Sequence, residues 1–264
     1  MNISKSKIKQ IHSLDSKKGR RESGLFIAEG PKVVGDLLEL MPAKLIIATA
    51  AWLKVNDDRI NGAEIIEVSD EELKKASLLQ HPQKVLALFP ILNNTDKNDC
   101  HLVNLLTDKD KDGKQKLTIA LDGVQDPGNL GTIIRIADWF GISDIICSHD
   151  TVDAFSPKVV QATMGSIARV HIHYADLENL IKALPDNYPI YGTFLDGCNL
   201  YDKQLSAGGI IIMGNEGKGI SQPVKALVNQ RLLIPNYPKG RKTADSLNVA
   251  IATAITCAEF RRRI

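Results

Sequence analysis

The sequence predicts an α/β protein whose C-terminal part is a mostly parallel sheet covered by helices. Apolar stretches of strand length alternate with stretches in which apolar residues recur at helix spacing, which indicates alternating strands and helices. Several of the strands are continuous apolar runs, of which GIIIM at 209–213 is the clearest. Such runs are typical of parallel sheets that are buried on both faces.

The composition is that of an ordinary globular protein, with 44% hydrophobic and 24% charged residues among 264. No apolar run approaches the length of a membrane span, and no apolar signal core follows the N-terminal lysines, so we expect a cytoplasmic protein without a membrane partner. The cysteines are scattered and form no C-x-x-C pair, which favours a reduced protein over a disulfide framework or a zinc site. They are Cys100, Cys147, Cys198 and Cys257.

The first 22 residues are basic, and their apolar residues recur roughly at helix spacing, so the basic side chains are expected on the exposed side of a helix. A basic cluster of this kind can follow an RNA phosphate backbone. A merely solvated helix face explains the same pattern equally well. The candidate RNA-binding residues are Lys17, Lys18, Arg20 and Arg21.

Residues 1–90 are predicted to form a first domain, a small sheet covered by helices. Its expected strands are 25–30, 44–48, 63–68 and 85–89, and its expected helices are 31–40, entered at proline, and 71–78. Residues 91–116 are polar, mixed in charge and free of aromatic residues, which is the composition of a linker. A short helical turn at 102–106 is the one element expected there.

Residues 117–264 are predicted to form the second domain. Its expected strands are 117–121, 144–147, 169–174, 189–194, 209–213 and 231–234, and its expected helices are 130–140, 157–164, 177–184, 222–229 and 246–262. Ser246 is the expected N-cap of the last helix. Parallel sheets bind their ligands beyond the carboxyl ends of the strands, so we expect the functional residues in the turns that follow them.

The first such turn lies in LDGVQDPGNLGTIIRIADWFG, residues 121–141. A strand that enters a helix through a Gly/Asn turn leaves free backbone N–H groups at the positive end of the helix dipole, which suits an anion. Arg135 lies off the apolar stripe of this helix, where its guanidinium could meet a phosphate. An ordinary βα unit with a solvated arginine is the alternative interpretation.

Two more turns follow predicted strands: GNEGKG at 214–219 and the long IPNYPKGRKTADSLN at 234–248. The first matches neither the P-loop spacing nor the dinucleotide-binding Gly-x-Gly-x-x-Gly. Polar residues stand on all three turns, which favours one shared site over three coincidences. They are Asn129, Glu216, Ser246 and Asn248.

These three stretches resemble the three ordered motifs of the SpoU (TrmH-type) RNA ribose methyltransferases of the SPOUT superfamily, from about residue 117 to the C-terminus. LFIAEGPKVV and HPQKVLALF resemble the ribosomal-protein-like RNA substrate-binding domain of that family. The resemblance implies S-adenosyl-L-methionine as methyl donor, rRNA or tRNA as acceptor and 2′-O-methylribose as product. It also implies a homodimer and a C-terminal trefoil knot.

Residue by residue, the resemblance implies a catalytic set and a set of largely backbone contacts to the cofactor. The catalytic set is Asn129, Arg135, Glu216, Ser246 and Asn248, and the cofactor set is Thr193, Gly214, Asn215, Gly219, Ile234 and Leu247. Two departures stand out: the third turn is longer and more basic than usual, with Lys239, Arg241 and Lys242, and Asp245 replaces a frequent Glu.

No metal is expected, since His171 and His173 alternate on one strand without carboxylate or cysteine neighbours in the sequence. A catalytically idle RNA-binding protein of the same fold is the alternative to a methyltransferase, and the intact catalytic set argues against it.

Overall fold

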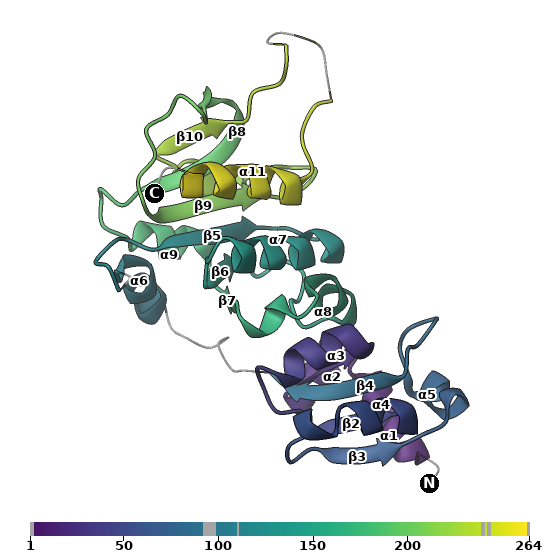
Figure 1. Ribbon diagram of the computed structural model, residues 1–264. Coiled ribbons are helices and arrows are strands. Elements are labelled where there is room, and N and C mark those ends of the chain that lie inside the picture. The colour runs from purple at the N-terminus through teal and green to yellow at the C-terminus, as the bar shows by residue number, and fades with distance from the viewer. Residues whose placement is uncertain (1–2, 92–98, 110, 239–240, 242–243, 263–264) are drawn as a thin grey trace. The chain divides into compact units, whose positions relative to one another are not determined.

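The computed structural model describes residues 3–91, 99–109, 111–238, 241 and 244–262, and its chain forms two compact units (Figure 1). The first unit comprises Met1–Asn93 with Asp153–Arg169, and the second comprises Asn94–Val152 with Val170–Ile264. Within the described ranges, no helix has both the length and the apolar character needed to cross a membrane.

The first unit is built on a four-stranded sheet in the order β1-β4-β2-β3, in which β2 and β3 are parallel and the other pairs antiparallel. Its strands are β1 (Leu25–Glu29), β2 (Leu45–Ala48), β3 (Glu64–Glu67) and β4 (Val85–Pro90), all close to the predicted ranges. Its helices include α3 (Pro31–Leu38), α4 (Ala50–Val55), the 3-10 turn Asp57–Arg59 and α5 (Asp70–Ala76). Only α4 and the 3-10 turn were not predicted from the sequence.

The basic N-terminal segment forms two helices rather than one, α1 (Lys5–Ser13) and α2 (Lys17–Ser23), each capped by a serine side chain. Ile11 and Leu14 are fully buried against β1, β2 and β4. The prediction that all basic residues face solvent is wrong for Arg20, whose side chain is 3% exposed. Lys17, Lys18 and Arg21 are exposed as predicted.

Arg20 can be buried because its guanidinium finds hydrogen-bond partners within the fold. It donates to Asp153 Oδ2 at 2.6 Å and to the carbonyl oxygens of Leu14 and Asp15 at 2.6 and 2.9 Å. A charge removed from water is tolerated only where such partners replace its hydration. We therefore remove Arg20 from the candidate RNA-binding surface.

A segment from the second half of the sequence completes the core of the first unit. The ring of Phe155 lies 5.2 Å from that of Phe26, and α8 (Pro157–Thr163) packs against β1. At the end of α8 the backbone takes two successive positive φ angles, 50° at Met164 and 90° at Gly165. A Cβ at Gly165 would lie 2.7 Å from the Cβ of Asp36, so this close approach requires glycine.

The second unit contains a six-stranded sheet in the order β10-β8-β9-β5-β6-β7, and every neighbouring pair is parallel. Its strands are β5 (Leu117–Asp122), β6 (Asp144–Cys147), β7 (His171–Tyr174), β8 (Ile190–Asn199), β9 (Gly209–Gly214) and β10 (Gln230–Leu233). The predicted parallel sheet is therefore confirmed. All its carboxyl ends, and the turns that follow them, lie at one edge.

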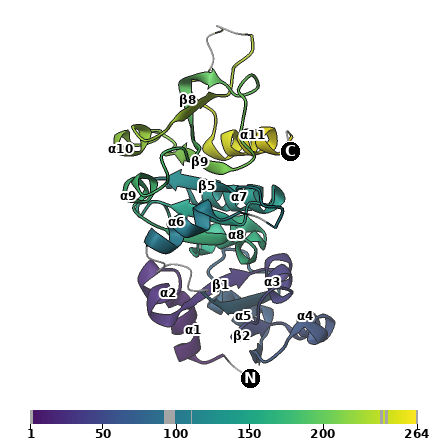
Figure 2. The same cartoon turned by 90° about the vertical axis from the view of Figure 1, so that its left-hand side faces the viewer.

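Helices cover both faces of this sheet (Figure 2). On one face α7 (Pro127–Trp139) contacts α11 (Val249–Arg262), and on the other α9 (Leu177–Lys182) contacts α6 (Asp99–Thr107) and α10 (Gln222–Lys225). The stretch predicted as a linker thus contains a packed helix, since Leu102 and Leu106 of α6 are buried in the core with α9. The expected helical turn at 102–106 is thus part of a packed helix, which two apolar residues one turn apart attach to the core within a mostly polar sequence.

Helix α11 begins three residues later than predicted, and its cap is Asn248 rather than Ser246. The Asn248 Oδ1 atom accepts hydrogen bonds from the backbone N–H groups of Ala250 at 2.9 Å and Ile251 at 3.3 Å. Asparagine is as good an N-cap as serine, so the sequence alone did not separate the two.

Replacing Arg20 tests the first unit. Arg20→Ala removes a buried guanidinium with all its hydrogen bonds and leaves the half-buried Asp153 carboxylate without this partner, so we expect the free energy of unfolding to fall by about 2–4 kcal/mol, measured by urea denaturation. Lys18→Ala is the control: Lys18 pairs with Glu22, at 3.8 Å and with both side chains exposed, and loss of this pair should change stability by less than about 0.5 kcal/mol. Equal effects of the two variants would contradict the structural role of Arg20.

Candidate active site

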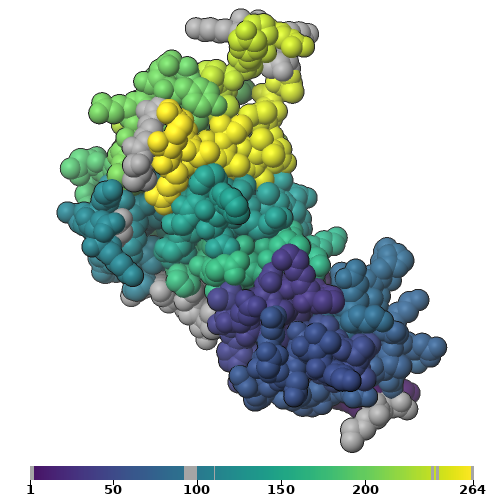
Figure 3. All heavy atoms as spheres, in the orientation of Figure 1, coloured from purple at the N-terminus to yellow at the C-terminus, as the bar shows by residue number. Residues whose placement is uncertain are grey.

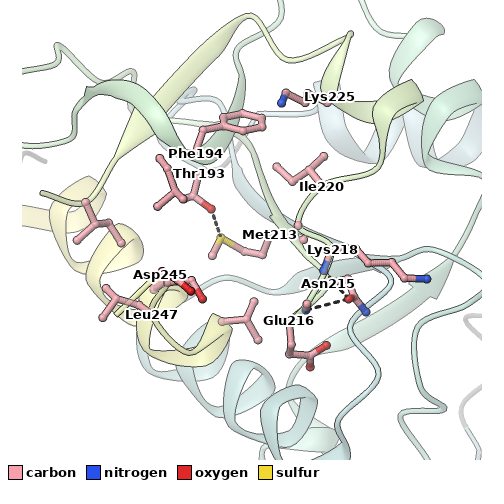
Figure 4. A pocket seen from close by; sticks show the side chains of 18 of the residues that line it. Thr193, Phe194, Met213, Asn215, Glu216, Lys218, Ile220, Lys225, Asp245 and Leu247 are labelled. Atoms are coloured by element: carbon pink, nitrogen blue, oxygen red, sulfur yellow. Dashed lines mark hydrogen bonds between the residues drawn. The ribbon is translucent and has the colours of Figure 1, made fainter. Parts of the chain in front are cut away.

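The carboxyl ends of β8, β9 and β10 enclose, together with the start of α11, a cavity of about 560 Å³ (Figure 4). This volume lies within the range of small-molecule binding sites. The predicted catalytic residues Glu216 and Ser246 line it. So do all six predicted cofactor residues, Thr193, Gly214, Asn215, Gly219, Ile234 and Leu247.

The turn after β9 folds tightly back on itself. Asn215 and Gly219 exchange backbone hydrogen bonds of 3.0 and 2.9 Å, and Asn215 Oδ1 accepts from the N–H groups of Gly217 and Lys218. A Cβ at Gly214 would lie only 2.3 Å from backbone atoms of Gly219 and Ile220. Gly214 is therefore required first for the turn itself, and not only for close approach of a ligand.

Two side chains of this turn hold it against the turn that follows β5. Asn215 Nδ2 donates to the carbonyl oxygen of Gly123 at 2.7 Å. The Glu216 carboxylate accepts from the backbone N–H groups of Asp126 at 3.2 Å and Gln125 at 3.3 Å. The first two predicted motifs thus form one hydrogen-bonded unit at the edge of the sheet.

Asn129 extends this unit to the third motif. Its Nδ2 donates to Glu216 Oε1 at 2.9 Å, and its Oδ1 accepts from Asn248 Nδ2 at 2.8 Å. Asn248 Oδ1 caps α11, so both the nitrogen and the oxygen of each side-chain amide are hydrogen-bonded, which fixes the orientation of the two amides. The structure therefore brings three of the five predicted catalytic residues into one hydrogen-bonded chain, Glu216–Asn129–Asn248.

Glu216 acts in this chain as an anchored carboxylate. Partial burial raises the pKa of Glu216, but hydrogen bonds from Asn129, its own backbone, Asp126 and Gln125 outweigh it and hold the pKa below its ordinary value. The group is therefore ionised at neutral pH and stabilises the folded site there. This stabilisation is lost as the pH falls from the pKa of an ordinary glutamate to the lower pKa that Glu216 has in the folded protein. A carboxylate so engaged is poorly suited to accept a substrate proton.

Arg135 lies on α7, six residues after Asn129, and its side chain is exposed. It is not among the residues that line the cavity, and its side chain makes no hydrogen bond or ion pair with another residue in the described ranges. Its guanidinium is thus available to an external ligand. Of the five predicted catalytic residues, Arg135 alone neither lines the cavity nor joins the hydrogen-bonded chain.

One wall of the cavity was not predicted. Strand β8 pairs with β10 at Tyr191 and Gly192 and again at Cys198 and Asn199, so residues 193–197 bulge out of the ladder over the cavity. Arg231 holds this bulge: its guanidinium carbon lies 3.8 Å from the centre of the Phe194 ring, and its Nη2 donates to Asp196 Oδ1 at 2.5 Å. The bulge depends on strand register, which no local pattern reveals.

The lining fits S-adenosylmethionine, which joins an adenosine to a positively charged sulfonium and a zwitterionic amino-acid end. Leu247, Ile220 and Met213 provide apolar surface for the adenosine. The carboxylate of Asp245 suits its positive groups, and Lys218 and Lys225 suit its carboxylate.

Among the described residues, no three His, Cys, Asp or Glu side chains are placed to hold a metal ion. The two histidines of β7 instead face one carboxylate at the opposite edge of the sheet. His173 is buried with its Nε2 2.9 Å from Asp144 Oδ1, and His171 Nδ1 lies 3.4 Å from the same oxygen.

Comparison with known protein families agrees with this geometry. Residues 116–258 match the model of the SpoU rRNA Methylase family, and residues 5–87 match that of the MRM3-like substrate binding domain. Solved structures are similar over nearly the whole chain. A putative RNA methyltransferase of the TrmH family from Porphyromonas gingivalis is 37% identical with a TM-score of 0.82, and the similarity covers 100% of both chains.

An AdoMet-bound rRNA methyltransferase from Sinorhizobium meliloti is 30% identical with a TM-score of 0.83, over 100% of this chain and 97% of the other. In sequence, the Bacillus subtilis protein named 23S rRNA (guanosine(2553)-2′-O)-methyltransferase RlmP is 27% identical, over 97% of this chain and 96% of its own length. An uncharacterized tRNA/rRNA methyltransferase from Synechocystis is 30% identical over 97% and 90%.

Removing Arg231 tests the wall of the cavity. Arg231→Ala takes away the guanidinium that stacks on Phe194 and pairs with Asp196, and such contacts at a partly exposed site are worth about 1 kcal/mol. We expect the affinity for S-adenosylmethionine, measured by calorimetry, to fall by about three- to tenfold with the fold intact. Lys182→Ala, which removes an exposed pair on α9, is the control. Unchanged affinity in Arg231→Ala would show that the bulge keeps its shape without the contacts of Arg231 to Phe194 and Asp196.

Proposed function

The chain belongs to the SpoU rRNA methylase family, and we propose that it transfers a methyl group from S-adenosylmethionine to a ribose 2′-hydroxyl of structured RNA. The observation that carries this proposal is the hydrogen-bonded chain Glu216–Asn129–Asn248 beside the donor cavity, since it unites all three family motifs. Ribosomal RNA is the favoured acceptor, because relatives that are similar over nearly the whole chain, the proteins from Bacillus subtilis and Sinorhizobium meliloti, are named rRNA methyltransferases. Transfer RNA is the alternative.

When bound, S-adenosylmethionine supplies an electrophilic methyl group, and the protein must present the hydroxyl to it. Arg135 is the proposed acceptor-side group: its exposed guanidinium binds an RNA phosphate and orients the neighbouring ribose. A guanidinium does not give up its proton in proteins, so the hydroxyl proton leaves by another route. Holding the reacting groups in place can by itself lower a barrier by about 7 kcal/mol or more.

The domains divide this work. The proposed substrate-binding domain covers residues 1–90, with Lys17, Lys18 and Arg21 as its exposed basic residues on α2. Residues 91–116 connect it to the methyltransferase domain, 117–264. Asp153–Arg169 completes the core of the first unit, so deletion of the N-terminal half would remove the residues that this segment packs against. The division of work between the domains is therefore tested in the full chain.

The protein is further proposed to act as a homodimer in the cytoplasm, with a trefoil knot in its C-terminal part. Support for the dimer comes from α7 and α11, which contact one another and carry exposed apolar residues, Trp139 at 85% and Ile251 at 52%. Ala258 of α11 is exposed and small enough for close packing of a second copy, whereas Ala250 is buried within the chain. The knot rests on the family resemblance.

Arg135 provides the test of the chemistry. Arg135→Ala should abolish the formation of 2′-O-methylated nucleosides in rRNA, detected by mass spectrometry after digestion, and leave the affinity for S-adenosylmethionine within about tenfold. Arg135→Lys should not restore transfer, because a point charge does not replace the planar fork. A wild-type protein that binds RNA and S-adenosylmethionine yet transfers no methyl group would instead be the idle RNA-binding protein.

Light scattering at micromolar concentration tests assembly. We expect the mass of two chains for the wild type, and a shift towards one chain for Trp139→Glu, which places a charge on the proposed interface. A wild-type mass of one chain would contradict the dimer.

A further inference from the structure

The loop between β10 and α11 carries an aromatic and a basic side chain that the reaction above does not use. Tyr237 is 91% exposed, and Arg241, four residues later, is also exposed. The described part of this loop projects away from β10 and α11 in the ribbon and forms a protrusion on the surface (Figures 1 and 3). Sequence analysis singled out the loop for its length and charge, without assigning it a role.

Hydrogen bonds close the loop into a turn that keeps these two residues together. The N–H of Arg241 donates to the carbonyl oxygen of Pro238 at 3.1 Å, and Asn236 Nδ2 donates to the carbonyl oxygen of Arg241 at 3.0 Å. These two bonds hold the backbone of Arg241 close to Asn236 and Pro238, the neighbours of Tyr237 in the sequence.

Both ends of the loop line the donor cavity. Ile234, three residues before Tyr237, lines the cavity, and so do Asp245, Ser246 and Leu247 at the other end of the loop. A ligand that reaches this turn while its ribose faces the donor must extend only a short way from the reacting atoms.

The exposed ring does not contribute to the fold, in contrast to other tyrosines of this unit. Tyr188 and Tyr191 are 4% and 3% exposed, and their hydroxyl groups bond to the carbonyl oxygen of Leu106 and to Ser206 Oγ. Tyr237 buries almost nothing, so its large apolar ring is available to a partner.

We propose that Tyr237 and Arg241 form a platform on which an unpaired base of the RNA substrate stacks, next to the nucleotide that is methylated. An exposed aromatic ring and a guanidinium on one loop are a combination that binds single-stranded RNA, through base stacking and phosphate contact. The inference rests on the proposed function, since it takes RNA as the substrate of the neighbouring site.

Charge favours RNA over a second copy of the chain as the partner. Residues 234–248 contain three basic residues and one acidic residue, a net charge of +2, and the whole chain also has a formal net charge of +2. A positive loop is attracted by a phosphate backbone and not by a positively charged copy of the same protein. Because paired bases cannot be splayed onto a ring, the platform selects an unpaired nucleotide.

Binding of a fluorescein-labelled, 20-nucleotide single-stranded RNA of mixed sequence, and of a duplex of the same length, tests the platform in the full chain. Tyr237→Leu keeps an apolar side chain without a ring, and should weaken single-strand binding at least about fivefold, whereas Tyr237→Phe should stay within about twofold. Binding of the duplex and of S-adenosylmethionine should not change. Arg241→Ala should flatten the logarithmic salt dependence of single-strand binding by about 0.7 for one lost phosphate contact.

Three results would overturn the platform: single-strand binding by Tyr237→Leu equal to that of the wild type, an equal loss of single-strand and duplex binding, or a lower oligomeric mass of Tyr237→Leu in light scattering. The last would make the turn an interface between copies. Methyl transfer by the wild type to rRNA is measured in parallel. If the wild type transfers no methyl group but Tyr237→Leu alone loses single-strand binding, the proposed function fails while the platform stands.

Discussion

The site depends on the side-chain amide of Asn129, which is hydrogen-bonded at both ends. Its Nδ2 holds Glu216 on the turn after β9, and its Oδ1 holds Asn248 at the start of α11. The three turns are far apart in sequence, and parallel strands bring them to one edge of the sheet. Because the Asn129 amide is the member that the two bonds share, its removal breaks both links between the turns at once.

The donor cavity and the acceptor side are linked through the same contacts. Glu216, Ser246 and the residues around Gly214 line the cavity, while Asn129 stands at the start of the helix that carries Arg135. The ionised Glu216 is too strongly hydrogen-bonded to serve as a base, and Arg135 keeps its proton. Transfer is thus explained by position: the cavity places the donor, and the role proposed for the exposed Arg135 guanidinium is to place the acceptor.

Much of this could be predicted from the sequence because the signals are local. Continuous apolar runs predicted the parallel sheet, and Gly/Asn turns after strands predicted where the site residues gather. The failures all depend on contacts distant in sequence. The burial of Arg20 requires Asp153, and the bulge at Phe194 requires the register of β10 against β8. The role of Asn248 as cap, and not Ser246, requires the partner Asn129, since both residue types begin helices equally well.

A double-mutant cycle between Asn129 and Asn248 tests the central claim most directly. Asn129→Ala, Asn248→Ala and the double variant are compared by kcat/KM for methyl transfer to rRNA. The helix cap is lost in both variants that lack Asn248, so its effect cancels from the coupling free energy. The account predicts a coupling free energy of at least about 1 kcal/mol, the double variant being little worse than the poorer single variant. Effects that add within about 0.5 kcal/mol would contradict it, since the two amides would then act independently.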